Sequence, residues 1–165
     1  MVIIPEEEQI IRLVNEYSDM VLRLALAYVH NMADAQDLCQ DVFMRIHEKK
    51  MAFRDHEHEK AWIIKVTSNR CKDFLRSAWH RKAKPVEDIS THSAWPGQSG
   101  SEETNEILDL VKNLPPQYCI VIHLYYLEGY GTREISQILS KNESTIRTQL
   151  KRAREQLKNM MSGGQ

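Results

Sequence analysis

The chain has 165 residues, of which 42% are hydrophobic, and its formal net charge is −1. This length suits one domain or two small ones, and lobes of about 60–80 residues would bury only modest cores. The first residues do not resemble a signal peptide, and no apolar run approaches the ~20 residues that a membrane helix needs. These features exclude a membrane-spanning protein, and we expect a soluble, cytoplasmic one.

Cysteine usage argues against structural cross-links. Cys39, Cys71 and Cys119 stand far apart, each beside apolar neighbours. An odd count without a C-x-x-C pair is typical of neither a disulfide framework nor a zinc site. We interpret all three as buried free thiols of a reducing compartment.

Sites for metal ions or for catalysis are not indicated either. His56 and His58 alternate with Glu57 and Glu59, but two loop histidines without further ligands are a weak metal signal. We interpret them as solvated polar residues. The sequence shows no nucleophile with a base, no acid–base pair and no phosphate loop, so we predict no metal, no cofactor and no enzymatic activity.

Charge is arranged in four blocks of alternating sign. Residues 1–59 hold six basic and twelve acidic side chains, whereas residues 60–85 hold eight basic side chains against Asp73 alone. Residues 86–129 are again acidic, and residues 130–165 are again basic. Two basic blocks separated by acidic ones suggest two separate contacts with anionic partners.

The first half of the chain predicts three helices, because apolar residues recur at three- and four-residue steps. The first helix ends near His30, and the second begins around Asp34, where Asp34 and Asp37 favour a helix N-terminus. A loop at 51–57 precedes the third helix, which runs towards Trp79. The inner stripe of the second helix comprises Ala35, Leu38, Val42, Phe43 and Ile46.

A Pro- and Gly-containing stretch interrupts this pattern at 82–102. Such a segment contributes little core and holds no helix. We interpret it as a flexible linker between an N-terminal domain at 1–81 and a C-terminal domain at 103–165. No segment of the chain alternates with period two over any length, so the predicted fold class is all-α, with two small helical domains.

The C-terminal domain is predicted to contain a helix-turn-helix. A short helix at 132–139 precedes a turn at 140–142, where Asn142 is suited to a left-handed conformation. In the following helix, Ile146, Leu150, Ala153 and Leu157 form one buried stripe. The opposite face suits the major groove of DNA, because hydroxyls and arginines reach base edges and phosphates. This face comprises Ser144, Thr145, Arg147, Thr148, Lys151, Arg152 and Arg154. The alternative is an ordinary amphipathic helix with solvated charges.

The third helix combines basic with aromatic side chains. Such a mixture suits single-stranded nucleic acid, because bases stack on rings while cations neutralise the backbone. The candidate DNA-binding residues are Lys65, Asn69, Arg70, Lys72, Asp73 and Arg76. For Trp62 and Phe74, however, a place in the core is the better interpretation.

Three motifs together resemble a known family. The segment DAQDLCQDVF at 34–43 is similar to the D-A-x-D-L-x-Q-(E/D)-x-F motif of extracytoplasmic-function sigma factors, which form group IV of the sigma-70 superfamily. The third helix resembles that family's promoter-melting helix, through Trp62, Asn69 and Asp73. The segment 131–157 resembles its helix-turn-helix. The turn at 141–143 lacks the proline or glycine that is frequent in the family, which leaves the promoter sequence open.

The resemblance implies a function and its partners. It implies a sigma factor that binds core RNA polymerase and reads the −35 element with the helix-turn-helix and the −10 element with the third helix. It implies that Asp37, Gln40, Asp41 and Met44 dock on the polymerase clamp, and that promoter DNA and an anti-sigma factor are partners. The alternative is a homodimeric helix-turn-helix regulator of a palindromic operator, which leaves 34–44 and the third helix unexplained.

Overall fold

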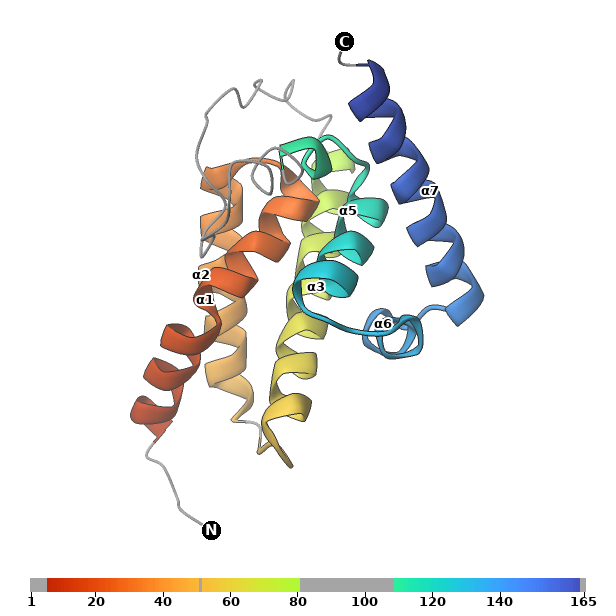
Figure 1. The fold of residues 1–165 in the computed structure, drawn as a ribbon. Helices are drawn as coiled ribbons and strands as arrows, with labels where there is room; N and C mark the ends of the chain where they lie inside the picture. Colours follow the sequence, from red (N-terminus) through yellow and green to blue (C-terminus); the bar gives the residue numbers. More distant parts are fainter. Residues whose placement is uncertain (1–5, 51, 81–108, 164–165) are drawn as a thin grey trace. The chain divides into compact units, whose positions relative to one another are not determined.

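The computed structural model describes residues 6–50, 52–80 and 109–163 of the chain. The chain divides into two compact units, 1–89 and 90–165 (Figure 1). Every regular element in the described ranges is helical, which confirms the all-α prediction. None of the described helices is long and apolar enough to cross a membrane. The predicted linker at 82–102 lies outside the described residues.

The N-terminal unit consists of three mutually packed helices. They are α1 (Glu6–Val29), α2 (Met32–Lys49) and α3 (His56–His80), drawn from red to yellow-green in Figure 1. Apolar side chains at helical spacing from all three are buried together, because this removes their surface from water. The largest fully buried members are Val21, Leu24, Val42, Ile63 and Ile64.

The connection between α1 and α2 differs from the prediction. His30 adopts a left-handed conformation with φ of 54°, which ends α1 at Val29. The side chain of Asn31 accepts a hydrogen bond from the Asp34 backbone N–H at 3.0 Å, so Asn31 is the N-cap. The helix therefore begins at Met32, two residues earlier than the sequence suggested.

Two small polar residues lie in the middle of α3. Thr67 and Ser68 are buried, at a point where the core requires small side chains. Their hydroxyls are satisfied, because Thr67 Oγ1 donates to the Ile63 carbonyl at 2.7 Å and Ser68 Oγ pairs with the Tyr28 hydroxyl. The Ser68–Tyr28 pair connects α3 to α1.

The C-terminal unit consists of α5 (Pro116–Ile122), the π-helical turn η1 (His123–Leu127), α6 (Thr132–Leu139) and α7 (Glu143–Gly163). Both α5 and α6 pack on α7. Ile146, Leu150 and Ala153 are buried, which confirms most of the predicted stripe, whereas Leu157 is half-buried. Pro116 stands in the first turn of α5, where its missing N–H costs nothing.

The turn between α6 and α7 uses a different residue from the one predicted. Ser140, with φ of 54°, takes the left-handed conformation, so the prediction for Asn142 was wrong. The backbone N–H of Lys141 returns to the Ser136 carbonyl at 2.9 Å, which is the hydrogen bond of a left-handed helix end. Ser136 is buried beneath this turn.

Candidate nucleic-acid and protein interfaces

The predicted DNA-reading face of α7 is exposed along its whole length. All seven candidate side chains are accessible, and they lie opposite the buried Ile146–Leu150–Ala153 stripe. The start of the helix is fixed to α6, because Thr132 Oγ1 donates to Glu143 Oε1 at 3.0 Å. Arg147 lies 3.8 Å from the same carboxylate oxygen, a weak contact that leaves its guanidinium available.

A polar hollow adjoins this face. It has a volume of about 280 Å³ and lies between the first turn of α5 and the first three turns of α7. Two of its lining residues, Gln117 and Tyr118, were not predicted from the sequence. They lie at least 25 positions before α7, and the periodicity of one helix carries no signal about a neighbouring helix. The lining residues are Gln117, Tyr118, Ser144, Thr145, Thr148, Gln149 and Arg152.

Arg154 differs from the other six candidates on α7. Its Nε donates to the Tyr126 hydroxyl at 2.7 Å. Its guanidinium carbon lies 5.5 Å from the Tyr125 ring centroid and 5.7 Å from that of Tyr126. These distances are in the range of cation–π interactions. Arg154 therefore connects α7 to η1, although its side chain is exposed.

The candidate residues of α3 fall into two groups. Lys65, Asn69, Asp73 and Arg76 are exposed, as a DNA-binding face requires, whereas Arg70 and Lys72 are half-buried. The structure thus brings four of the six together on accessible surface.

The aromatic residues of this region are half-buried. Trp62 packs on Phe53 with ring centroids 5.4 Å apart, and Phe74 is likewise half-buried. Trp62 and Phe74 therefore lie partly in the core, as the sequence suggested, and partly at the surface.

The candidate docking face of α2 is exposed at three of its four positions. Asp37, Gln40 and Met44 are accessible, and 63% of the Met44 surface faces solvent, which is unusual for so large an apolar side chain. The fourth residue, Asp41, is half-buried against α3.

Asp41 is bonded within the protein. Arg70 of α3 donates from Nε to Asp41 Oδ2, and Arg45 donates to the same oxygen at 3.1 Å. Partial burial alone would raise the pKa of Asp41. The hydrogen bonds and charges of Arg70, and then of Arg45, outweigh this effect and hold the pKa below its ordinary value. Asp41 is therefore an ionised carboxylate with two intramolecular partners.

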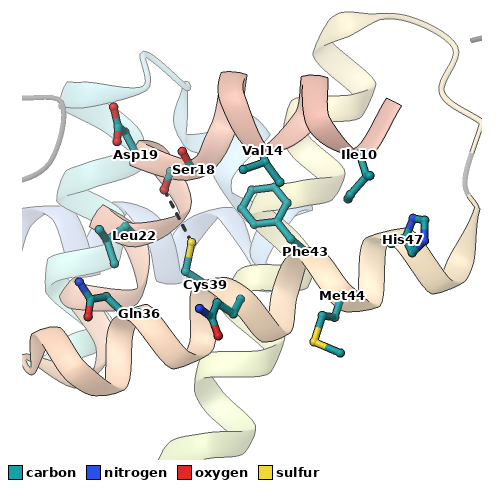
Figure 2. A pocket seen from close by; sticks show the side chains of 11 residues that line it. Ile10, Val14, Ser18, Asp19, Leu22, Gln36, Cys39, Phe43, Met44 and His47 are labelled. Carbon is teal, nitrogen blue, oxygen red and sulfur yellow. Dashed lines mark hydrogen bonds between the residues drawn. The ribbon is translucent and has the colours of Figure 1, made fainter. Parts of the chain in front are cut away.

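An apolar groove lies beside the docking face, between α1 and α2 (Figure 2). Its volume is about 800 Å³, and Gln40 and Met44 belong to both the groove and the docking face. Cys39 lies in the groove with its Sγ directed at the Ser18 carbonyl, 3.8 Å away (Figure 2). The lining residues are Ile10, Val14, Ser18, Asp19, Leu22, Gln36, Cys39, Gln40, Phe43, Met44 and His47.

A polar network joins α1 to the first turn of α3. Glu59 is only 7% exposed and accepts hydrogen bonds from Arg12 NH1 and NH2 at 3.1 and 2.7 Å. The Tyr17 hydroxyl donates to Glu59 at 2.9 Å. His56 bonds to Glu16, so it is not merely solvated, as the sequence suggested, although it is exposed.

This network includes atoms of the metal-ligand type. One such atom from each of Glu16, His56 and Glu59 lies within 4.8 Å of the other two. However, Arg12 donates to both oxygens of Glu59 and, at 3.0 Å, to Glu16. The guanidinium therefore already supplies the positive charge that these carboxylates require, and we interpret the network as structural.

Each unit of the chain matches a known family model. The family model for Sigma-70 region 2 matches residues 13–81, and that for Sigma-70, region 4 matches residues 104–157. The chain is 29% identical over 153 residues to the ECF RNA polymerase sigma factor SigM of Bacillus subtilis, covering 90% of this chain and 92% of SigM. It is 26% identical over 140 residues to SigV of the same organism, covering 85% of this chain and 83% of SigV.

Other similar proteins extend the comparison. The probable RNA polymerase sigma factor RfaY of Xanthomonas campestris is 25% identical over 156 residues, and the match covers 90% of this chain but 39% of RfaY. Among solved structures, the sigma factor RpoE in complex with the anti-sigma factor NepR from Bartonella quintana has the same fold. Its TM-score is 0.73 at 19% identity, over 93% of this chain and 97% of that one. From the two matching regions and these relatives, the chain belongs to the extracytoplasmic-function sigma factors of the sigma-70 family, which direct RNA polymerase to specific promoters.

Proposed function

We propose that this protein binds core RNA polymerase through α2 and reads two promoter elements, one with each of its units. The observation that carries this proposal is the pair of exposed basic faces on separate units, on α3 and on α7. Two such faces on one chain suit two contacts along the same promoter, whereas a single operator-binding domain requires only one.

The −35 element is assigned to α7. Six of its candidates, Ser144 to Arg152, present hydroxyls, amines and guanidinium groups. The Thr148 hydroxyl also donates to the Ser144 carbonyl at 3.0 Å, and Arg147 has only a weak contact with Glu143. Arginine and lysine pair with guanine edges, and hydroxyls accept or donate at several bases. The polar hollow beside Gln117 lies at the edge of this face and is suited to a backbone phosphate.

The −10 element is assigned to α3. Lys65 and Arg76 neutralise phosphates, and Asn69 offers an amide that pairs with a base edge. The half-exposed rings of Trp62 and Phe74 provide stacking surface for an unpaired base. Because unpaired bases bind here and paired bases do not, this binding favours the melted duplex. Lys72 and Asp73 complete the proposed face.

Docking is assigned to the exposed side of α2. Asp37 pairs with an arginine of the polymerase clamp through charge-assisted hydrogen bonds, and Met44 supplies apolar contact beside it. Asp41 lies at the edge of the same surface. This assignment explains why a soluble helix exposes Met44 to such an extent.

The remaining parts of the proposal follow from these contacts. The linker at 82–102 joins domains at 1–81 and 103–165 and extends towards the catalytic cleft of the polymerase. The protein acts in the cytoplasm, performs no covalent chemistry, and requires no cofactor or metal. An anti-sigma factor is a further partner, as it is for RpoE of Bartonella quintana.

The test is a titration of labelled promoter DNA with the free protein and with the holoenzyme. We expect weak, salt-dependent binding by the free protein, and tight binding by the holoenzyme. When one rigid complex holds both DNA contacts, the apparent affinity for the promoter rises by about 10²–10⁴. Inserting one to three base pairs between the elements should abolish this gain. Tight binding of a palindrome by the free protein would instead favour the dimeric regulator.

A further inference from the structure

One carboxylate connects the two proposed surfaces of the N-terminal unit. Asp41 belongs to the docking helix α2, and Arg70 belongs to the DNA-reading helix α3. Their side chains are bonded to each other, and they are 36% and 27% exposed, respectively. The ion pair is thus partly accessible to solvent.

The bond places Arg70 in a state that competes with DNA binding. Its Nε donates to Asp41 Oδ2, so part of its guanidinium is not available to a phosphate. Arg45 donates to the same oxygen at 3.1 Å. A carboxylate can accept about four hydrogen bonds, so Asp41 has capacity for about two more besides those from Arg70 and Arg45. Each added donor weakens the hydrogen bonds that the other donors make to Asp41.

We propose that Asp41 regulates the −10 surface by exchanging partners. In the free protein Asp41 holds Arg70. When the polymerase clamp docks on α2, a cationic side chain of the clamp engages Asp41 and releases Arg70 towards the DNA. This inference rests on the proposed function and adds to it a means by which docking activates DNA binding.

The physical conditions for such an exchange are present. A half-exposed ion pair is weak, because water screens it, so an incoming cation can displace it. A released guanidinium can bind a phosphate through two parallel hydrogen bonds. Because linkage is reciprocal, DNA that captures Arg70 should also tighten the binding of polymerase to Asp41.

Arg76 and Asp37 provide matched controls. Arg76 lies on the same helix as Arg70, is 75% exposed, and is only 3.8 Å from Asp73 on its own helix. Asp37 lies on α2 one turn before Asp41 and is exposed. Arg76→Gln and Asp37→Asn change the net charge by the same amount as Arg70→Gln and Asp41→Asn, but they leave the Asp41–Arg70 bond in place.

The first experiment measures single-stranded −10 oligonucleotide binding by the free full-length protein. Asp41→Asn should tighten binding by several-fold, because Arg70 is released, whereas Asp37→Asn should change it by less than about twofold. The gain should vanish in the Asp41→Asn/Arg70→Gln double variant. If Asp41→Asn weakens binding or leaves it unchanged, or if Asp37→Asn gives the same gain, the exchange is refuted and Asp41 is only a structural brace.

The second experiment remains decisive if Asp41→Asn fails to fold. The Kd for core polymerase is measured with and without saturating oligonucleotide. In the wild type the oligonucleotide should tighten core binding at least about fivefold. Arg76→Gln should weaken oligonucleotide binding itself, because Arg76 contacts a phosphate, but at saturating oligonucleotide it should retain this factor. Arg70→Gln should reduce the factor to less than half of the wild-type value. If the oligonucleotide tightens core binding by the same factor in Arg76→Gln and Arg70→Gln, the exchange is refuted. A wild type that does not bind core at all would instead refute the proposed function.

Discussion

Arg154 donates a hydrogen bond to the hydroxyl of Tyr126 at 2.7 Å, and the two residues lie 28 positions apart in the sequence, in different helical segments. The guanidinium also lies over the rings of Tyr125 and Tyr126. A basic residue in the predicted DNA-reading set is therefore also a connection between α7 and η1. Two residues of similar chemistry on one helix, Arg147 and Arg154, are expected to respond differently to substitution.

Arg147→Ala tests the major-groove assignment. Its guanidinium is exposed, with one weak contact to Glu143, so its removal should leave the melting temperature almost unchanged. Promoter binding by the holoenzyme should weaken by about 1–3 kcal/mol if Arg147 reads a base, and by less if it contacts a phosphate. Lys151→Ala should behave similarly. Unchanged transcription in vitro with both side chains removed would contradict the assignment.

Arg154→Ala tests the connection to η1. Loss of the hydrogen bond and the ring contacts should destabilise the protein by about 1–2 kcal/mol. Tyr126→Phe, which keeps the ring and removes the hydroxyl, should cost about 0.5–1.5 kcal/mol. Urea denaturation measures both. If Arg154→Ala retains full stability but weakens promoter binding as much as Arg147→Ala does, Arg154 serves as a direct DNA contact instead.

Asp37→Lys tests the docking face. Because Asp37 is exposed on α2, the charge reversal should leave the helix content and the melting temperature near those of the wild type. It should nevertheless prevent co-purification with core polymerase, because a lysine repels the cations that a carboxylate attracts. Glu8→Lys, an equal charge reversal at an exposed position of α1, is the control. Equal recovery of core with both variants would place the docking surface elsewhere.

The lowered pKa of Glu16 predicts how the stability of the protein depends on pH. The hydrogen bond with His56 is the main cause that lowers the pKa of Glu16 from 4.5, and the charge of Arg12 contributes. A carboxyl with a lowered pKa stabilises the fold above its unfolded pKa, and this stabilisation is lost as the pH falls through the folded pKa. The urea midpoint should therefore decline below about pH 4.5. Glu16→Gln should show a shallower decline, and an identical profile would contradict the predicted linkage.

Cys39 provides a probe of the groove between α1 and α2. Burial and the charge of Asp19 raise the pKa of its thiol to about 11. Burial raises the pKa of Cys71 and Cys119 to about 12. Since the thiolate is the reactive form, all three should react slowly with iodoacetamide in the native protein, and Cys39 should react first. Mass spectrometry measures the order.

Docking should protect Cys39 further, because the groove shares Gln40 and Met44 with the docking face. The comparison is the rate of Cys39 alkylation with and without an excess of core polymerase. Unfolding in urea, which should expose all three thiols to rapid reaction, is the positive control. An unchanged rate in the presence of core would show that the partner leaves this groove open.

Much of the fold was predictable, because each helix carries its own signal. The buried stripes of α2 and α7 follow from apolar spacing. Helix ends were less accurate. Asp34 and Asp37 were the predicted residues of the α2 N-terminus, whereas the N-cap is Asn31, and its position depends on the backbone conformation of His30.

The candidate faces were also predicted as sets of residues, but the bonds between helices were not. Nothing in local spacing relates Arg70 to Asp41, or Arg154 to Tyr126, because these pairs depend on how the helices pack. The same holds for Glu59. Its position beside His56 and His58 suggested a solvated acidic loop, whereas packing against α1 buries it with Arg12.

The π-helical turn η1 makes the C-terminal unit sensitive to chain length. A π-helical turn is a single-residue insertion in an α-helix, and each residue of a helix turns the following side chains by about 100°. Deleting one residue from His123–Leu127 is expected to restore a regular α-helix and to shift Tyr126 relative to Arg154. In this segment, therefore, insertions and deletions should be tolerated far less well than substitutions, even though Tyr126 and Leu127 are at the surface.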